Sequence, residues 1–489
     1  MIREARALST GTVSLKPLAS LVGKGKQMEN RQPFVLEKDS LRILRNALDR
    51  LEAGFSTLPP AASVPDEQAI ARVVFEVADR LHDNYPYFHP LYAGQMLKPP
   101  HPVARLAYAL ALWVNPNNHA LDGGRASSHM EKEAVAEIAR MFGWNTHLGH
   151  LCGGGTMANL EALWVAGLLR PNAKVVASQQ AHYTHSRISG VLRLEFESIP
   201  CDQRGRLDVK ALQRRLDRGG VGTVVATIGT TATGSVDPLP ELLELRDQYA
   251  FRLHADAAYG GYFNLADNLT AETRSVYDRL HEVDSIVIDP HKHGLQPYGC
   301  GCVVFRDPTV GRFYKHDSPY TYFSSSELHL GEISLECSRP GAAAVGLWAT
   351  HKLLPLVKGG EFARGLNSSR AAALALYDKL RADGRFITAS APELDIVVWA
   401  PRAARVSEAS EIAQLIFAEA EQRHLYLALA NLPVEMFDLP AAEMARDRDT
   451  ITCLRSVLMK PDHCEWVDAI WNILDQSAHA ALRERKPLS

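Results

Sequence analysis

The stretch Ser285-Ile-Val-Ile-Asp-Pro-His-Lys-His-Gly294 decides the fold, together with the earlier stretch His254-Ala-Asp-Ala-Ala-Tyr-Gly-Gly261. Each indicates a short apolar strand that ends in polar residues. The earlier strand ends in a lone carboxylate, Asp256, and the later one delivers Lys292 between two histidines. Ligands of open α/β sheets bind at the carboxyl ends of the strands. We therefore expect Asp256 and Lys292 to face one ligand.

An acid and a lysine at successive strand ends suit a bound pyridoxal phosphate. The lysine forms a Schiff base with this cofactor, and the acid keeps the pyridine nitrogen protonated so that the ring accepts electrons. Either motif alone is a weak signal, because a lysine after a strand is usually a solvated loop residue. The pair becomes specific only together with a site for the phosphate.

A glycine-rich turn provides a candidate phosphate site. It begins the stretch Cys152-Gly-Gly-Gly-Thr-Met-Ala-Asn-Leu-Glu-Ala-Leu163 and runs into an expected helix. Glycines let backbone N–H groups approach an anion, and the positive end of the helix dipole faces it. We expect Thr156 to cap this helix and to offer its hydroxyl; a plain tight turn is the competing interpretation. The turn matches neither GxGxxG nor a Walker loop, which disfavours nicotinamide cofactors and nucleoside triphosphates.

Two further strand ends carry polar side chains. His182 follows an expected strand, where an imidazole either stacks on a flat aromatic cofactor or caps the chain in solvent. The stretch Thr227-Ile-Gly-Thr-Thr231 ends another strand in hydroxyls, Thr230 among them, that are suited to bind phosphate or substrate.

Bulk properties exclude several classes of function. The chain has 489 residues, a formal net charge of −3 and 22% charged residues, which gives no case for binding nucleic acid or an anionic membrane. No apolar run reaches the roughly 18–20 residues that span a bilayer. Seven cysteines without a CxxC pair favour free thiols in a reducing cytoplasm. Nineteen histidines form no recognised ligand motif, so we expect no metal.

The order of expected elements divides the chain into four parts. We predict a flexible leader at 1–35, helical segments at 36–115, a large domain at 116–350 and a smaller α+β domain at 351–489. A helix at 131–142 opens the large domain, in which strands alternate with helices. This alternation predicts a mostly parallel sheet with helices on both faces. Strands are expected at 174–178, 221–228, 251–256, 284–289, 394–399 and 450–459, and helices at 207–217, 238–249, 407–422 and 465–483.

With these motifs in their order, the chain resembles the group II pyridoxal-phosphate-dependent amino acid decarboxylases, from about Tyr85 to the C-terminus. The resemblance implies the aspartate aminotransferase-like fold (fold type I). It implies that Lys292 holds the cofactor, Asp256 pairs with its pyridine nitrogen, and the ring lies between Ala258 and His182. The remaining residues implied around the phosphate are Gly155, Thr156, Asp289, His291 and, reaching the partner's site in an obligate homodimer, Ser338.

Two stretches look most like bacterial tyrosine decarboxylases: Tyr87-Phe-His-Pro-Leu-Tyr-Ala-Gly94 and Leu335-Glu-Cys-Ser-Arg-Pro-Gly-Ala-Ala-Ala344. Tyr87 and Phe88 are accordingly candidate substrate contacts, although aromatics under a loop are as often plain packing. The family uses a loop tyrosine to protonate the substrate carbon, a role that falls on Tyr320, with Tyr322 second. Arg455 matches a family arginine near the substrate carboxylate; a structural salt bridge is the alternative.

Arg125 stands where relatives usually carry proline. It either pairs with an acidic substrate side chain or is a surface charge. The sequence therefore predicts a cytoplasmic carboxy-lyase that converts an L-amino acid to its amine and carbon dioxide, with an aromatic substrate such as tyrosine favoured. The alternatives are a glutamate or aspartate decarboxylase, a carbon–carbon lyase or aldehyde synthase of the same fold, and a non-catalytic pyridoxal-binding protein.

Overall fold

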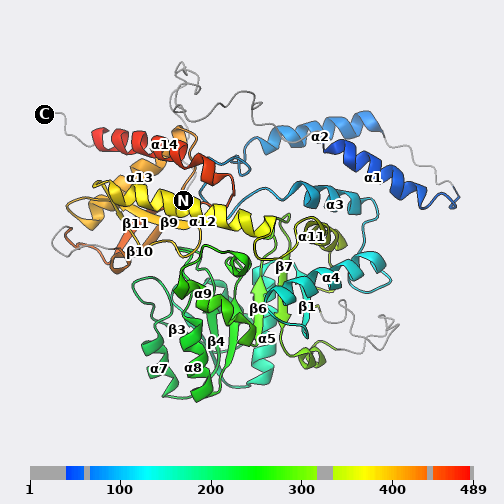
Figure 1. The fold of residues 1–489 in the computed structure, drawn as a ribbon, viewed down its shortest axis with the longest axis horizontal. Helices are drawn as coiled ribbons and strands as arrows, with labels where there is room; N and C mark the ends of the chain where they lie inside the picture. The colour runs from blue at the N-terminus through cyan, green and yellow to red at the C-terminus, as the bar shows by residue number, and fades with distance from the viewer. Residues whose placement is uncertain (1–39, 60–65, 316–333, 438–443, 485–489) are drawn as a thin grey trace. The chain divides into compact units, whose positions relative to one another are not determined.

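The computed structural model describes residues 40–59, 66–315, 334–437 and 444–484. Its larger sheet has seven strands in the order β1-β7-β6-β5-β4-β2-β3 (Figure 1). Strands β6, β5, β4, β2 and β3 are parallel, whereas β7 runs antiparallel to both of its neighbours. The strands are β1 (Leu148–Cys152), β2 (Lys174–Ser178), β3 (Phe196–Ile199), β4 (Val221–Thr227), β5 (Arg252–Asp256), β6 (Ser285–Ile288) and β7 (Gly301–Phe305).

Helices cover both faces of this sheet. Alternate residues of one strand point to opposite faces, so in β4 Val224 and Ala226 join one hydrophobic core and Val225 another. The first core also contains residues of α4 (Arg125–Met141), α7 (Val209–Leu216), α8 (Leu239–Tyr249) and α9 (Ala271–Asp278). The opposite face is covered by α5 (Gly155–Leu169) and α6 (Thr184–Val191).

A second sheet of four antiparallel strands follows in the sequence, in the order β10-β11-β9-β8. Helices α12, α13 and α14 pack around it (Figure 1). The elements are β8 (Phe386–Thr388), β9 (Ile396–Pro401), β10 (Ala428–Pro433), β11 (Thr450–Val457), α12 (Glu361–Ala382), α13 (Val406–Gln422) and α14 (His463–Glu484). The predicted boundary near residue 350 stays a prediction.

The first two helices leave an apolar surface uncovered. Neither α1 (Leu41–Ala53) nor α2 (Glu67–Leu81) contains a buried residue. Helix α3 (Pro102–Leu112), in contrast, packs on α11 (Gly341–Leu353), which also contacts α4. The exposed apolar side chains of α1 and α2 are Leu41, Ile43, Ile70, Val73, Val74, Phe75, Val77 and Leu81.

The predicted mixture of a mostly parallel sheet with helices and a smaller α+β part is confirmed. The strands predicted at 174–178 and 251–256 differ from β2 and β5 by one residue at most. The helix predicted at 131–142 is wrong at its start, because α4 begins six residues earlier, at Arg125. Among the described residues, no helix combines the length and apolarity that crossing a membrane requires. The leader at 1–35 lies outside the described residues.

Candidate active site

The carboxyl ends of β4, β5 and β6 and the turn after β1 enclose a cavity of about 480 Å³. The paired registers bring these ends together, since Thr227 pairs with Asp256 and Asp256 with Val287. The predicted residues that line the cavity are Gly155, Thr156, His182, Asp256, Ala258, Asp289, His291 and Lys292. The structure thus brings eight sequence-predicted residues to one place.

Asp256 is held as a buried carboxylate at the end of β5. His185 Nε2 lies 2.8 Å from its Oδ2, and the Ala258 N–H donates to its Oδ1 at 3.2 Å. Burial alone would raise the pKa of Asp256, but the hydrogen bond and charge of His185 outweigh it and hold the pKa well below its usual range. Asp256 therefore stays ionised, as a partner for a protonated ring nitrogen must.

Lys292 reaches the same cavity from the turn after β6. Its Nζ lies 3.0 Å from Asp289 Oδ2, and its backbone N–H donates to the Asp289 carbonyl at 2.9 Å, which closes a tight turn. Asp289 is buried, and its Oδ1 has no hydrogen-bond partner among the described residues. The Thr227 hydroxyl at the cavity wall is unpartnered in the same sense. Such orphaned buried groups point to a polar ligand.

The glycine-rich turn forms the N-terminus of α5, as predicted. Gly154, with a φ of 153°, precedes the helix. A Cβ on Gly155 would lie 2.8 Å from Asp289 Oδ2, so a larger residue would require that carboxylate or the start of α5 to shift. The predicted cap is wrong: Thr156 lies within the helix, no side chain caps α5, and Thr156 Oγ1 accepts from Thr184 at 3.3 Å. The first amides of the helix have no partner within it and are available to an anion.

His182 stands at the cavity wall as a neutral imidazole. Burial lowers its pKa, and the Thr184 N–H donates to its Nδ1 at 3.3 Å, which leaves the proton on Nε2. A neutral flat ring is suited to stack on an aromatic cofactor. His291 is also in the wall: its Nδ1 accepts from the Cys300 N–H at 3.3 Å, and burial lowers its pKa.

Other predicted residues lie away from the cavity lining. The Thr230 hydroxyl bonds Thr233 at 2.7 Å, and its neighbours Gly229 and Thr231 line the cavity instead. Arg125 is exposed at the start of α4, and Ser338 is exposed with its hydroxyl bound to Asn117. Tyr320 and Tyr322 lie outside the described residues.

The remaining predicted substrate residues are Tyr87 and Phe88, in the loop between α2 and α3, and Arg455, in β11 of the second sheet. The Tyr87 ring packs on Tyr92 at 5.0 Å, and Phe88 is exposed. Arg455 in β11 is buried, with one hydrogen bond from its Nη1 to Gln95 at 3.3 Å. Its Nε and Nη2 have no partner among the described residues. The alternative of a structural salt bridge for Arg455 is therefore not supported by the residues that the structure describes.

Sequence reasoning missed three residues of this site. His185 contacts the Asp256 carboxylate, and its only signal in the sequence is that it lies three residues after His182. Tyr259 lines the cavity next to Ala258, and Glu336 accepts from the Gly153 N–H at 3.1 Å through each carboxylate oxygen. Glu336 lies in the stretch Leu335–Ala344, but nothing there marks it as a partner of the glycine turn, which it meets across 183 residues.

These groups fit pyridoxal phosphate. The cavity offers a lysine amine, an ionised carboxylate, free helix amides and the orphaned Asp289 and Thr227 oxygens in one wall. Lys292 would hold the cofactor, Asp256 its ring nitrogen and the Gly155 turn its phosphate. The described residues contain no cluster of three groups suited to a metal ion.

Comparisons with known proteins agree with this chemistry. The family model of the pyridoxal-dependent decarboxylase conserved domain matches residues 160–401. A probable L-tyrosine/L-aspartate decarboxylase of Methanothermobacter thermautotrophicus is 30% identical over 53% of this chain and 70% of its own length. An L-tyrosine decarboxylase of Enterococcus faecium is 27% identical over 58% of this chain; the match spans 63% of that relative.

The fold is shared with solved structures. Oryza sativa TDC, solved with PLP and tryptamine, superposes with a TM-score of 0.72 at 20% identity and covers 92% of this chain and 99% of its own. This likeness agrees with the predicted aspartate aminotransferase-like fold. Together with the family match, it assigns the cofactor as pyridoxal phosphate. The chain belongs to the family of pyridoxal-dependent decarboxylases.

Proposed function

We propose that this protein decarboxylates an L-amino acid to its amine. The observation that carries the proposal is the convergence of Lys292 and ionised Asp256 on one cavity beside the neutral ring of His182. When bound, pyridoxal phosphate supplies the electron sink that takes up the electron pair of the bond broken at the substrate's α-carbon.

The residues of this chain then divide the work. Lys292 would hold the cofactor through its side-chain amine. Asp256, whose pKa is held well below its usual range, would supply the negative charge that stabilises a protonated ring nitrogen. Tyr320, by resemblance to the family, is our candidate for returning a proton to the α-carbon.

Arg455 is our candidate for the substrate carboxylate. Its guanidinium is buried with two nitrogens, Nε and Nη2, free of partners among the described residues, and burial lowers its pKa. A carboxylate would satisfy both donors in the bidentate geometry that arginine favours. Arg455→Lys should therefore raise KM more than it lowers kcat.

We propose tyrosine or another aromatic amino acid as the substrate. A cluster of aromatic rings is formed by Tyr85, Tyr87, Tyr92 and Tyr426, with neighbouring ring centroids 5.0 to 6.3 Å apart. Arg455 interacts electrostatically with Tyr92 of this cluster. An acidic substrate is the second candidate, because the Methanothermobacter relative is named for tyrosine and aspartate alike. Arg125, exposed in the single chain, enters the site only if a partner subunit covers it.

Product analysis by mass spectrometry tests these proposals. The protein loaded with pyridoxal phosphate receives tyrosine, DOPA, phenylalanine, tryptophan, glutamate and aspartate separately. Tyramine or another aromatic amine supports the main proposal, and GABA or β-alanine moves the specificity to the acidic class. Aldehyde indicates the lyase or oxidative alternative. Full cofactor occupancy without turnover on any of these substrates would indicate a non-catalytic pyridoxal-binding protein.

Two matched variants test the role of Lys292. Lys292→Ala should lose the visible absorbance of the bound cofactor together with turnover, because no amine remains to hold it. Lys358→Ala, which removes an exposed lysine, should keep both. Unchanged absorbance and turnover in Lys292→Ala would rule out this assignment.

We further propose that the protein acts as a cytoplasmic homodimer. The uncovered apolar side chains of α1 and α2 support a second copy as their partner. The free thiols of Cys300 and Cys302, both buried, support a reducing compartment.

A further inference from the structure

A buried chain of polar groups starts at the cavity wall and leads away from the cofactor site. The Tyr259 hydroxyl donates to Asp395 Oδ1 at 2.5 Å. On the other side of this carboxylate, His293 Nε2 lies 3.2 Å from Oδ2, and neither side chain is exposed. This contact is a close charge pair and not a formed hydrogen bond, because neither atom has a hydrogen-bond partner among the described residues. Lys98 Nζ lies 3.5 Å from His293 Nδ1. None of these four groups has a part in the chemistry proposed above.

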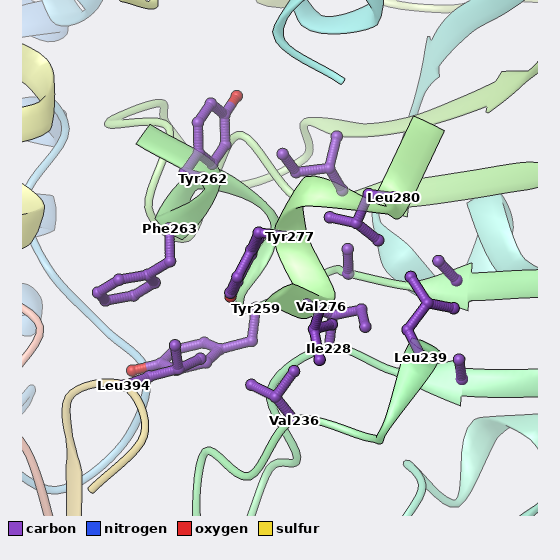
Figure 2. Close-up of a cluster of buried hydrophobic side chains, with 14 of the residues drawn as sticks. Ile228, Val236, Leu239, Tyr259, Tyr262, Phe263, Val276, Tyr277, Leu280 and Leu394 are labelled. Atoms are coloured by element: carbon purple, nitrogen blue, oxygen red, sulfur yellow. The ribbon is translucent and has the colours of Figure 1, made fainter. Parts of the chain in front are cut away.

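These four polar groups come from four separate parts of the sequence. Tyr259 follows β5, His293 follows Lys292 directly, Asp395 precedes β9, and Lys98 lies in the loop before α3. Figure 2 shows the Tyr259 ring beside Leu394, the residue before Asp395, with Phe263 close by. The ring of His293 packs edge-on against Tyr259 at 4.8 Å and Phe263 at 5.0 Å. Asp395 therefore ties the segment that carries Lys292 to the second sheet.

The pKa values of Asp395 and Lys98 depend on each other and on the groups between them. Burial would raise the pKa of Asp395, but His293, Tyr259 and Lys98 outweigh it and lower the pKa, so the group is a carboxylate. Burial lowers the pKa of Lys98 to about 8 even though Asp395 opposes the change. The other titratable groups that interact electrostatically with Asp395 or Lys98 are Tyr277, Arg455, Lys460 and His463.

We propose that Asp395 is a positioning residue for Lys292, and that the pair Asp395 and Lys98 sets the electrostatic potential at the Lys292 nitrogen through His293. Asp395 fixes the backbone after Lys292 by holding His293 and fixes the cavity wall by holding Tyr259. The inference rests on the proposed cofactor site. It adds two residues that touch neither cofactor nor substrate.

Two variants should shift the protonation of the Lys292 nitrogen in opposite directions. Asp395→Asn removes a negative charge at constant shape, so it should lower the pH midpoint of the cofactor's visible absorbance by about half a pH unit or more. Because the pKa of Lys98 is about 8, Lys98→Met removes a positive charge at similar length below that pH, so it should raise the same midpoint. The measurement is an absorbance titration of the full-length, cofactor-loaded chain from about pH 6 to about pH 10. The dissociation constant of the cofactor, measured alongside, should rise in Asp395→Asn.

Glu393→Gln is the matched control. Glu393 is also buried and lies two residues before Asp395, but it bonds Arg204 and the Val236 N–H on the far side of the loop. It should leave the midpoint unchanged. A merely structural role for Asp395 would lower thermal stability in both Asp395→Asn and Glu393→Gln without moving the midpoint.

The outcomes separate the inference from the proposed function. Midpoints that stay at the wild-type value, or that move the same way in Asp395→Asn and Lys98→Met, overturn the inference while the cofactor site stands. A shift in Glu393→Gln equal to that in Asp395→Asn overturns it as well. A wild-type protein that takes up no pyridoxal phosphate overturns both. If Asp395→Asn fails to fold, the direction of the Lys98→Met shift decides alone.

Discussion

The imidazole of His185 and the carboxylate of Asp256 are joined at 2.8 Å, and both side chains are buried beneath the cofactor cavity. Behind them, His254 bonds Ser285 at 2.9 Å and Asn159 at 2.8 Å, and burial lowers its pKa to about 3. Two buried histidines, His185 and behind it His254, therefore lie next to one carboxylate. This arrangement keeps Asp256 charged in a place where burial alone would protonate it.

Removing the His185 donor should weaken cofactor binding. In His185→Leu the burial of Asp256 is no longer offset, its pKa rises, and its attraction for a protonated ring nitrogen falls. We expect the dissociation constant of pyridoxal phosphate to rise by about tenfold, equivalent to about 1.4 kcal/mol, as measured by absorbance titration. His185→Gln keeps a donor and should recover part of the affinity. Equal affinities in His185→Leu and wild type would show that the pair has no role in cofactor binding.

Gly155→Ala should damage the phosphate site. Its Cβ would lie 2.8 Å from Asp289 Oδ2, so either the carboxylate or the start of α5 must shift. We expect cofactor affinity to fall at least tenfold, with thermal stability reduced. Gly190→Ala is the control, because a Cβ at this position in α6 meets nothing within 4 Å and alanine favours helix. It should bind cofactor normally and be equally or slightly more stable.

Lys460 should make the free energy of unfolding depend on pH between about 7 and about 10.5. The side chain is buried, its Nζ donates to the Tyr92 carbonyl at 2.6 Å, and burial lowers its pKa to about 7. Below that pH the folded state carries a buried charge; above the unfolded value of about 10.5 neither state is charged. The contribution of Lys460 to the free energy of unfolding therefore rises with pH between these two values.

The variant Lys460→Met lacks this dependence. Its thermal midpoint should exceed that of wild type most at pH 6 to 7, by an amount equivalent to roughly a few kcal/mol, and the difference should shrink as the pH approaches 10. Thermal denaturation across this range checks the sign. A difference that grows with pH would contradict the account.

The apolar side of α2 should be required for dimer formation. Val74 is 54% exposed and lies among other exposed apolar residues of the helix. Val74→Asp should halve the mass measured by light scattering and lower activity if each site draws on both subunits. Leu168→Asp changes an exposed leucine of α5, 46% exposed, and should leave the mass unchanged. A wild-type protein that is monomeric at all concentrations would contradict the homodimer proposal.

The strand ends that carry the site were predictable, because each reads locally as an apolar run followed by one polar residue. Asp256 and Lys292 needed no knowledge of distant contacts. His185 was not predictable as the partner of Asp256, since 71 residues separate them and a histidine in a short helix has no distinctive pattern. The turn after β4 directs the Thr230 hydroxyl to Thr233 and places Thr231 in the cavity lining, so the role of Thr230 stays a prediction.

The position of β7 in the sheet could not be predicted from its local sequence either. Cys300 and Cys302 indicate an apolar strand, but its direction and neighbours depend on which sheet edge is open. The structure inserts it antiparallel between β1 and β6, where Cys302 pairs with both Leu151 and Ile288. Only long-range packing settles such an order.

This insertion of β7 has a consequence for how the protein is made. Gly301 pairs with Cys152, and a Cβ there would lie 2.5 Å from the Gly154 backbone, so the glycine turn is held in place by a strand about 150 positions later. Contacts of such wide sequence separation form late and slowly. During synthesis, the halves of the cofactor site stay apart until β7 has emerged from the ribosome. Pyridoxal phosphate thus binds only after β7, which ends at Phe305 of the 489 residues, has been made, and its capture reports that the sheet has closed.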